Sequence, residues 1–449
     1  MISIVRAAFA VLVIAVLAAM VAGCGDTFRP TINFQPQPSG DPSVTGQAII
    51  LSTNPAGNGS NTHIDVSGDT NVGVVTVGSN PLFLGKGSGR VFSINSDNTL
   101  TIYIALLPQV STVTTIGLPG TVSGAIGGAS SSNGNIYIAD RLSNDVSVIP
   151  GGQNVVTTVV PVGSEPVMVA TNASGNKAYV LNHSDNTVTV IGTQDNSVIK
   201  TIPVGAQPIW GVMSNDGQDV FIVNQGEGTM SVIDTALDKV LCTPPTPAGP
   251  PPPSCTSTLN LNGVGVSASL ASNFAFYDNV RKRVYVTNPG DNSITIVKAD
   301  SINLGINPQI LPTFLAKVAV SGSPVSVGAI ADGTRVYAAL GNCPAGINHI
   351  NLLADLPSCT GNKVSVVDVI GFRESKVITI GAGTVSVAPS VDGTKVFAVN
   401  SHDGNISIIK TSTDSELLRM AAPLQNLSCS NPAICPATAQ TPFAVLTFP

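Results

Sequence analysis

The sequence is poor in charge, and poorest in positive charge. Asp, Glu, Lys and Arg make up 10% of its 449 residues, with 20 basic residues against 26 acidic ones. No run of Lys or Arg occurs. Proteins that bind nucleic acids need clustered basic side chains to neutralise phosphates. We therefore expect no nucleic-acid partner.

The sequence also lacks the motifs of common catalytic and metal sites. It has no C-x-x-C or C-x-x-C-H motif, no G-x-S-x-G turn, no phosphate-binding loop and no dinucleotide fingerprint. Its four histidines, His63, His183, His349 and His402, do not recur at one repeat position, and we expect each to be a satisfied surface side chain. The sequence thus identifies no catalytic, cofactor-binding or metal-binding residue, and it indicates no cofactor.

Glycine and proline, by contrast, are abundant, with 44 and 32 residues. They separate short runs such as AYVLN and TVTVI within the stretch from Asn176 to Ile191. Both runs alternate and are rich in β-branched or aromatic residues, and the residues between them favour a tight turn. Similar hairpins end at Ile233, Val297 and Ile409. Because a lone hairpin is barely stable in water, the copies must stack, and the pattern predicts an all-β fold.

The hairpins belong to a longer repeat of four strand-like runs, two of which form the hairpin. An aromatic residue in the second run marks each copy, at intervals of 42 to 64 residues. The longer intervals contain insertions. These aromatic residues are Phe92, Tyr137, Tyr179, Phe221, Tyr285, Tyr337 and Phe397. Four-stranded units at this period predict a β-propeller.

The two ends of the predicted propeller complement each other. TPFAVLTF, from Thr441 to Phe448, matches the first strand of a unit, whereas the segment that begins GQAIILST at Gly46 matches the second to fourth strands. One blade built from both ends would close the ring and leave no open edge. Counting this composite blade predicts eight blades. Seven blades remain the alternative, if the N-terminal strands instead decorate a neighbouring blade.

The strands YVLN, FIVN and YVTN, with their turns and TVTVI-like partners, resemble the repeats of the YVTN family. The resemblance extends from about Thr45 to Pro449, although residues 136–140 and 336–341 depart from the pattern. It implies the propeller fold. Known members of the family include surface-layer and other envelope proteins, and the fold is shared with unrelated enzymes, so the resemblance alone does not assign a function.

The first residues predict export and lipid attachment. Arg6 precedes an apolar run from Ala7 to Val21 that is short for a membrane span and typical of a signal peptide. The sequence V-A-G-C that ends at Cys24 resembles the lipobox of bacterial lipoproteins, in which the cysteine is lipidated. Residues 1–23 would be the signal peptide, residues 24–43 a proline-rich tether, and residues 44–449 the propeller. Gly25 follows Cys24, which in that family favours the outer membrane over the inner one.

The six cysteines other than Cys24 fall into three sequential pairs. Each pair brackets an irregular insertion, and six cysteines allow fifteen connectivities. Local disulfides that staple these insertions fit an exported protein, whereas a zinc site is a weaker alternative because no C-x-x-C occurs. The pairs are Cys242 with Cys255, Cys343 with Cys359, and Cys429 with Cys435.

One repeat position differs in size around the ring. Two residues after the proline that opens a repeat, early units carry Phe83, Met168 and Trp210. Their later counterparts are small and include Ser326 and Ser386, with Ala444 in the closing strand. If this position faces the central channel, one arc would be bulky and apolar and would form a binding patch. Ordinary packing between blades is the alternative.

The sequence predicts an exported, lipid-anchored propeller that acts as a binding or scaffold module in the bacterial cell envelope. Its expected partners are the membrane, through the lipid, and an envelope protein or glycan. One alternative is a propeller hydrolase or lactonase with polar residues in the channel. Another is a surface-layer or adhesion component.

Overall fold

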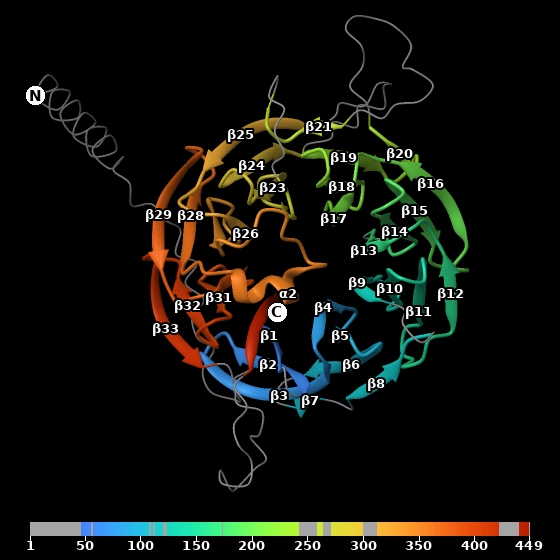
Figure 1. Ribbon diagram of the computed structural model, residues 1–449, viewed down its shortest axis with the longest axis horizontal. Coiled ribbons are helices and arrows are strands. Elements are labelled where there is room, and N and C mark those ends of the chain that lie inside the picture. Colours follow the sequence, from blue (N-terminus) through green and yellow to red (C-terminus); the bar gives the residue numbers. More distant parts are fainter. Residues whose placement is uncertain are drawn as a thin grey trace, which may run out of the picture. The chain divides into compact units, whose positions relative to one another are not determined.

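The computed structural model forms a ring of eight antiparallel sheets around a central axis (Figure 1). It describes residues 46–54, 57–106, 109–110, 113–119, 124–172, 174–241, 258–263, 271–299, 312–421 and 440–448. Cys24, Cys242, Cys255, Cys429 and Cys435, and the predicted signal peptide and tether, lie outside these ranges. The ring confirms the predicted eight-bladed β-propeller.

Each blade contributes one strand to each of four concentric layers. The innermost strands of blades 1 to 8 are β34 (Thr441–Phe448), β4 (Pro81–Gly87), β9 (Ala125–Ser130), β13 (Pro166–Thr171), β17 (Pro208–Met213), β22 (Phe274–Asp278), β26 (Pro324–Ala329) and β30 (Thr384–Pro389). The second strands are β1 (Gln47–Thr53), β5 (Arg90–Asn95), β10 (Ile136–Asp140), β14 (Lys177–Asn182), β18 (Asp219–Asn224), β23 (Arg283–Asn288), β27 (Arg335–Leu340) and β31 (Lys395–Asn400).

The two outer layers complete the blades, and in blades 2 and 5 the outermost strand is split into two short pieces. The third strands are β2 (Asn58–Asp65), β6 (Thr99–Leu106), β11 (Asp145–Ile149), β15 (Thr187–Gly192), β19 (Thr229–Asp234), β24 (Ser293–Lys298), β28 (Lys363–Asp368) and β32 (Asn405–Lys410). The outermost strands are β3 (Thr70–Ser79), β7 (Gln109–Val110) with β8 (Thr114–Gly117), β12 (Thr158–Pro161), β16 (Val198–Pro203), β20 (Lys239–Val240) with β21 (Leu259–Asn260), β25 (Thr313–Ala319), β29 (Arg373–Thr379) and β33 (Ser415–Ala421).

Blade 1 closes the ring with strands from both ends of the propeller. β34 pairs antiparallel with β1, from Gln47 opposite Phe448 to Thr53 opposite Thr441. The red β34 therefore lies beside the blue β1 in Figure 1. This is the composite blade that the sequence predicts, and it leaves the ring without an unpaired first strand.

An asparagine at the end of the second strand fixes the hairpin in most blades. In blade 4 the Nδ2 of Asn182 donates hydrogen bonds to Oγ1 of Thr187 at 3.0 Å and of Thr189 at 2.9 Å. Equivalent bonds form in blades 2, 5, 6 and 8. Blade 3 departs from the pattern, with Asp140 accepting hydrogen bonds from the amide and hydroxyl of Ser147 at 3.0 and 2.6 Å. A short polar side chain is needed here because it satisfies buried hydroxyls inside the turn.

The aromatic residues that mark the repeats are the core of the blades. All seven are fully buried, each in the second strand of its blade. Their flat rings fill the space between neighbouring sheets, which is why a large apolar side chain recurs at this position.

One connection between a second and a third strand differs from its counterparts in the other blades. The second and third strands of the other seven blades are joined by turns of three or four residues, whereas in blade 7 residues 341–362 join β27 to β28. We call residues 341–362 the closing loop. It carries the helices α2 (Leu352–Asp355) and η1 (Leu356–Ser358), and α2 lies over the middle of the ring in Figure 1. In the ranges that the structure describes, no helix has the length and apolar character needed to cross a membrane.

Candidate functional site

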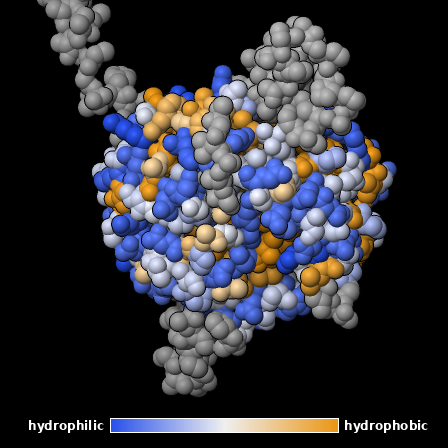
Figure 2. All heavy atoms as spheres, turned by 45° about the horizontal axis from the view of Figure 1, so that its top comes forward, coloured by the Kyte–Doolittle hydropathy of each residue, from blue (hydrophilic) through white to orange (hydrophobic). Residues whose placement is uncertain are grey.

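The centre of the ring contains a chamber of about 490 Å³. Residues of all eight innermost strands line it, together with residues of the closing loop. The volume falls within the range of small-molecule sites. The visible outer surface, by contrast, is mainly hydrophilic and interrupted by small apolar patches (Figure 2).

The repeat position singled out in the sequence does face this chamber. Phe83, Met168 and Trp210 line it on one arc. Their small counterparts Ser326, Ser386 and Ala444 line it as well. The expected division of the wall into a bulky and a small arc is therefore present, whereas ligand binding there remains a prediction.

The bulky arc has a fourth member that the sequence analysis missed. Phe274 of β22 faces Thr287 in the same register in which Met168 faces Leu181. No proline-opened motif precedes β22, so the position was not recognisable from the repeat. The ring of Phe274 lies 4.6 Å from that of Trp210, centroid to centroid, and Trp210 donates a hydrogen bond from Nε1 to the carbonyl of Ala275 at 3.1 Å. Trp210 is thus held between blades 5 and 6 with its ring against the chamber.

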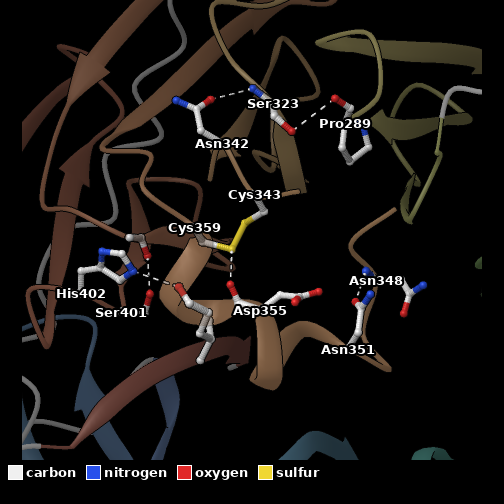
Figure 3. Close-up of a disulfide and its surroundings, with 12 residues drawn as sticks. Pro289, Ser323, Asn342, Cys343, Asn348, Asn351, Asp355, Cys359, Ser401 and His402 are labelled. Atoms are coloured by element: carbon white, nitrogen blue, oxygen red, sulfur yellow. Dashed lines mark hydrogen bonds between the residues drawn. A yellow bond between two sulfur atoms is a disulfide. The ribbon is translucent and has the colours of Figure 1, made fainter. Parts of the chain in front are cut away.

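The closing loop is tied to the rim of the ring at its base. A disulfide joins Cys343 to Cys359, in agreement with the pairing predicted from the sequence (Figure 3). The amide of Gly361 donates to the carbonyl of Gly341 at 2.7 Å. Nε2 of His402, in blade 8, lies 2.9 Å from the carbonyl oxygen of Leu356. These bonds hold the two ends of the closing loop close together. The residues between them therefore extend from the rim as a single compact segment.

The middle of the closing loop reaches across the ring. Nε2 of His349 lies 2.9 Å from the carbonyl oxygen of Val167 in blade 4, three blades away. Asn348 donates from Nδ2 to Oε1 of Gln225 in blade 5 at 2.9 Å. The imidazole of His349 also meets the ring of Trp210 edge-on, with 5.3 Å between centroids. The loop therefore bridges opposite sides of the chamber at the end where the innermost strands begin.

The structure corrects the expectation that His349 is a surface side chain. It lines the chamber half-buried, and burial lowers its pKa from 6.5 to about 4, with the positive charges of His183 and Arg141 acting in the same direction. Its neutral form donates from Nε2 to the Val167 carbonyl, and Nδ1 finds no partner in the described part of the chain. No local pattern in the sequence indicates this position, because the contact joins residues far apart in the chain.

His63 is likewise not at the surface. It is fully buried in β2, with its Nδ1 3.0 Å from Oε1 of Gln47 and its Nε2 3.0 Å from the hydroxyl of Tyr103 in blade 2. Burial lowers its pKa to about 4. A buried imidazole with both nitrogens bonded is a structural link between blades 1 and 2. The other two histidines lie on the rim, where His402 is exposed and His183 is half-buried.

The opposite end of the chamber is more polar. Ser130, Thr171 and Thr447 line it near the ends of their strands, and so does the exposed Lys86. The hydroxyl of Thr171 donates to the carbonyl of Ser130 at 3.0 Å, and that of Thr447 to the carbonyl of Pro389. Lys86 and His349 are the ionisable residues of the described lining, which contains no carboxylate.

The described residues contain no group of three or more His, Cys, Asp or Glu side chains placed to hold a metal ion.

A second hollow, of about 500 Å³, lies on the rim at Glu165, His183 and Gln207. Glu165 is bound there by Arg141 at 2.8 Å and by the hydroxyl of Ser184. These polar groups already satisfy one another, so the central chamber is the stronger candidate.

Comparison with known proteins supports the fold and does not assign a family. No protein-family model matches the sequence, and no curated protein matches it. The resemblance to YVTN repeats and the lipoprotein signal therefore remain predictions from the sequence.

Solved structures with the same architecture are numerous and diverse. Dihydro-heme d1 dehydrogenase NirN, in complex with DHE, is similar over 92% of this chain and 76% of its own, with 11% identity and a TM-score of 0.64. AztD from Citrobacter koseri is similar over 90% and 97%, with 10% identity and a TM-score of 0.57. Hydrazine synthase from Kuenenia stuttgartiensis is similar over 75% and 96%, with 17% identity and a TM-score of 0.51. At these identities the likeness establishes the propeller and no function.

Proposed function

We propose that this protein is an exported, lipid-anchored β-propeller that acts as a binding module of the bacterial cell envelope and holds its ligand in the central chamber. The observation that carries the proposal is the chamber itself, with its bulky apolar arc and the closing loop across one end. A cavity of this size with mainly apolar walls and a few polar groups is the usual form of a small-molecule site.

The N-terminal sequence supports the place of action. An apolar segment that ends in V-A-G-C at Cys24 is followed by a proline-rich stretch up to Ser43. A lipid on Cys24 would anchor the chain, and the stretch after it would act as a tether. In this arrangement the propeller presents its chamber to the space beside the membrane, with the outer membrane favoured by Gly25.

No observation favours the other candidate functions. A hydrolase or lactonase would place polar and acidic groups around the reacting atoms, and no carboxylate is among the described residues that line the chamber. A scaffold for an envelope protein or glycan, or a surface-layer component, would use the loops on the faces of the ring instead. A protein partner found in the experiments below would favour the scaffold.

Two experiments test the two halves of the proposal. Cys24→Ser should release the protein from the membrane fraction, and unchanged membrane association would contradict lipid anchoring.

Native mass spectrometry of the full-length protein, gently extracted from envelopes, should show a bound small molecule. Trp210→Ala should lose that mass, whereas Leu237→Ala, at an exposed position in blade 5, should retain it. A stoichiometric protein partner without a small molecule would favour the scaffold instead.

A further inference from the structure

We propose that one face of the ring rests on the membrane surface, through exposed apolar side chains in the turns of blades 6, 7 and 8. This inference rests on the proposed function, because the lipid on Cys24 would bring that face to the bilayer. It adds the orientation of the ring and the residues that contact lipid. We call these side chains the docking patch: Val280, Ala331, Ile370, Phe372 and Val391.

The ring has two different faces. On one face the second strand of each blade is joined to the third, and the closing loop belongs to this face. On the other face the first strand turns into the second, and the third turns into the fourth. The whole docking patch lies in turns of this other face. We call it the N-terminal face, because β1, the first strand of the ring, begins there at Gln47.

The docking patch continues from blade to blade. Blades 6, 7 and 8, with innermost strands β22, β26 and β30, are neighbours in the ring (Figure 1). A Cβ atom added at Gly333 of blade 7 would lie 3.0 Å from Val280 of blade 6, and one added at Gly393 of blade 8 would lie 3.1 Å from Ala331. The four large members of the patch expose between 39% and 58% of their surface. Apolar side chains exposed together in this way mark an interaction surface.

Phe372 is unusual for its position in the repeat. It lies directly before the fourth strand of blade 7 and has a φ of 51°. In blades 1, 5 and 8 an aspartate holds this position, also with positive φ, and pairs with a cation of the preceding blade. These aspartates are Asp69, Asp238 and Asp414. Aspartate tolerates the left-handed conformation far better than a bulky side chain does.

Blade 7 gives up both advantages of the aspartate. Arg283, the first residue of the second strand of blade 6, has its guanidinium carbon 5.4 Å from the centroid of the Phe372 ring, where the other blades have a carboxylate. The phenylalanine is also exposed, so it adds little to the core. A strained side chain at an exposed position indicates a role other than stability.

The turns that carry the docking patch have balanced charge. Together they contain two basic residues, Arg281 and Lys282, and two acidic ones, Asp332 and Asp392. Each aspartate accepts a hydrogen bond from a main-chain amide of its own turn. A strongly charged partner would therefore gain little here. The layer of zwitterionic headgroups and acyl chains at a membrane surface fits an apolar patch with both signs of charge around it.

The attachment of the chain indicates why the partner is a membrane. Cys24 precedes Gln47 by 23 residues, and a flexible chain of this length has a root-mean-square end-to-end distance of roughly 25–30 Å. A lipid on Cys24 would thus keep the N-terminal face near the bilayer, at a high effective concentration. The patch alone is small, so Cys24→Ser should still release the protein. In the docked state the closing loop faces away from the membrane.

The test places a tryptophan in the docking patch. The protein is the lipid-modified full chain carrying Trp210→Phe, which removes the single tryptophan of the sequence, together with Ile370→Trp. It is reconstituted on phosphatidylcholine vesicles with brominated or ordinary acyl chains. We expect the brominated chains to lower the fluorescence about 2-fold, since a side chain at the boundary of headgroups and acyl chains can contact them. Leu142→Trp is the matched control, equally exposed in a turn of the opposite face, and should not be quenched.

A second substitution tests the role of Phe372. Phe372→Asp restores the residue of blades 1, 5 and 8 beside Arg283, so the variant should be at least as stable as the parent in urea unfolding. It should nevertheless reduce the quenching of Ile370→Trp to the level of the Leu142→Trp control. Val198→Asp, which puts the same charge on an exposed position of β16 in the outer wall, should leave the quenching unchanged.

Flotation of the same samples separates this inference from the function on which it rests. Protein that floats with the vesicles while Ile370→Trp stays unquenched, or while Phe372→Asp leaves the quenching unchanged, would overturn docking and leave the lipid anchor standing. A dimer joined through the patch would also leave the tryptophan unquenched and would overturn docking. Protein that does not float at all would overturn the anchor and, with it, the docking.

Discussion

Single charged residues connect several of the blades to the next one. In blade 4, Nζ of Lys177 lies 2.7 Å from Oδ2 of Asp238 in blade 5, and the hydroxyl of Tyr179 donates to Oδ1 of the same aspartate at 3.0 Å. Arg335 with Tyr337 meets Asp414 in the same way between blades 7 and 8. Between blades 8 and 1, Nζ of Lys395 lies 2.6 Å from Asp69. A cation at the first position of the second strand thus recurs because it holds the turn of the following blade.

Asp238→Ala should cost about 3 kcal/mol of unfolding free energy, because both a lysine and a buried tyrosine hydroxyl lose the carboxylate and keep only the carbonyl of Thr235. Urea unfolding followed by circular dichroism measures the loss. Asp195→Ala is the control, since Asp195 lies in an exposed turn and bonds only the nearby Ser197 in the contacts described. Equal stability of the two variants would show that the blade-to-blade bond contributes nothing.

A second prediction concerns the hairpin asparagine. Asn182→Ala should cost about 1–3 kcal/mol, since the hydroxyls of the half-buried Thr187 and the buried Thr189 lose their donor. Asn182→Asp should cost less, because blade 3 already uses Asp140 at this position. Thermal unfolding of both variants checks the order. A reversed order would mean that the side-chain amide is required as a hydrogen-bond donor and that a carboxylate of the same shape cannot replace it.

Among the connecting elements, the closing loop carries His349, and we expect the position of this loop to depend on pH. His349 is held neutral with a pKa of about 4 when the loop is in place, and it would return toward 6.5 once the loop detached. The detached loop therefore takes up a proton between pH 6.5 and 4, and the closed arrangement is favoured fully only above this window. The shift corresponds to about 3 kcal/mol across the window. The electrostatic effects of His183 and Arg141 also disfavour its protonation in the closed form.

Trp210 reports this change because it touches His349. We expect its fluorescence to be constant above pH 6.5 and to change as the pH falls toward 4. His349→Gln should remove that transition, whereas His63→Gln, in blade 1, should leave it in place. A transition that survives His349→Gln would assign it to another group.

The repeating elements were predictable from the sequence, and the closing loop was not. The strand runs, the turn residues and the aromatic residues such as Tyr179 follow from local periodicity, which is why the blades and the inward-facing Trp210 position could be predicted. Phe274 lacks the proline that marks its counterparts, and His349 contacts Val167 across the ring. No local sequence pattern predicts the inward-facing position of Phe274 or the contact of His349 with Val167. Both depend on which strands and loops the closed ring brings together.

On the scale of the whole molecule, the pairing of β34 with β1 determines whether the ring is complete. Deleting residues 441–448 would remove the innermost strand of blade 1 and expose the inner edge of β1. We expect this variant to aggregate, since an unpaired strand edge recruits other chains. Size-exclusion chromatography measures the outcome.

A circular permutant is the matched control for this deletion. Phe448 lies opposite Gln47 in the pairing of β34 with β1, so a short turn can join them. New ends placed between residues 421 and 440 would then make blade 1 continuous in sequence. We expect a folded monomer that binds as the parent does. Aggregation of the permutant as well would mean that the connection after β33, rather than the closing pair, keeps the ring intact.

The strands of blade 1, which come from both ends of the propeller, are synthesised at very different times. β1, β2 and β3 are made before every other strand of the ring, whereas their neighbour β34 is made last. A chain that emerges from its N-terminal end therefore carries an unfinished sheet throughout its synthesis. Contacts between residues so distant in sequence form slowly. Blade 1 therefore cannot be completed before the C-terminal strand has been made, and until then the edge of β1 is open to pairing with a wrong partner.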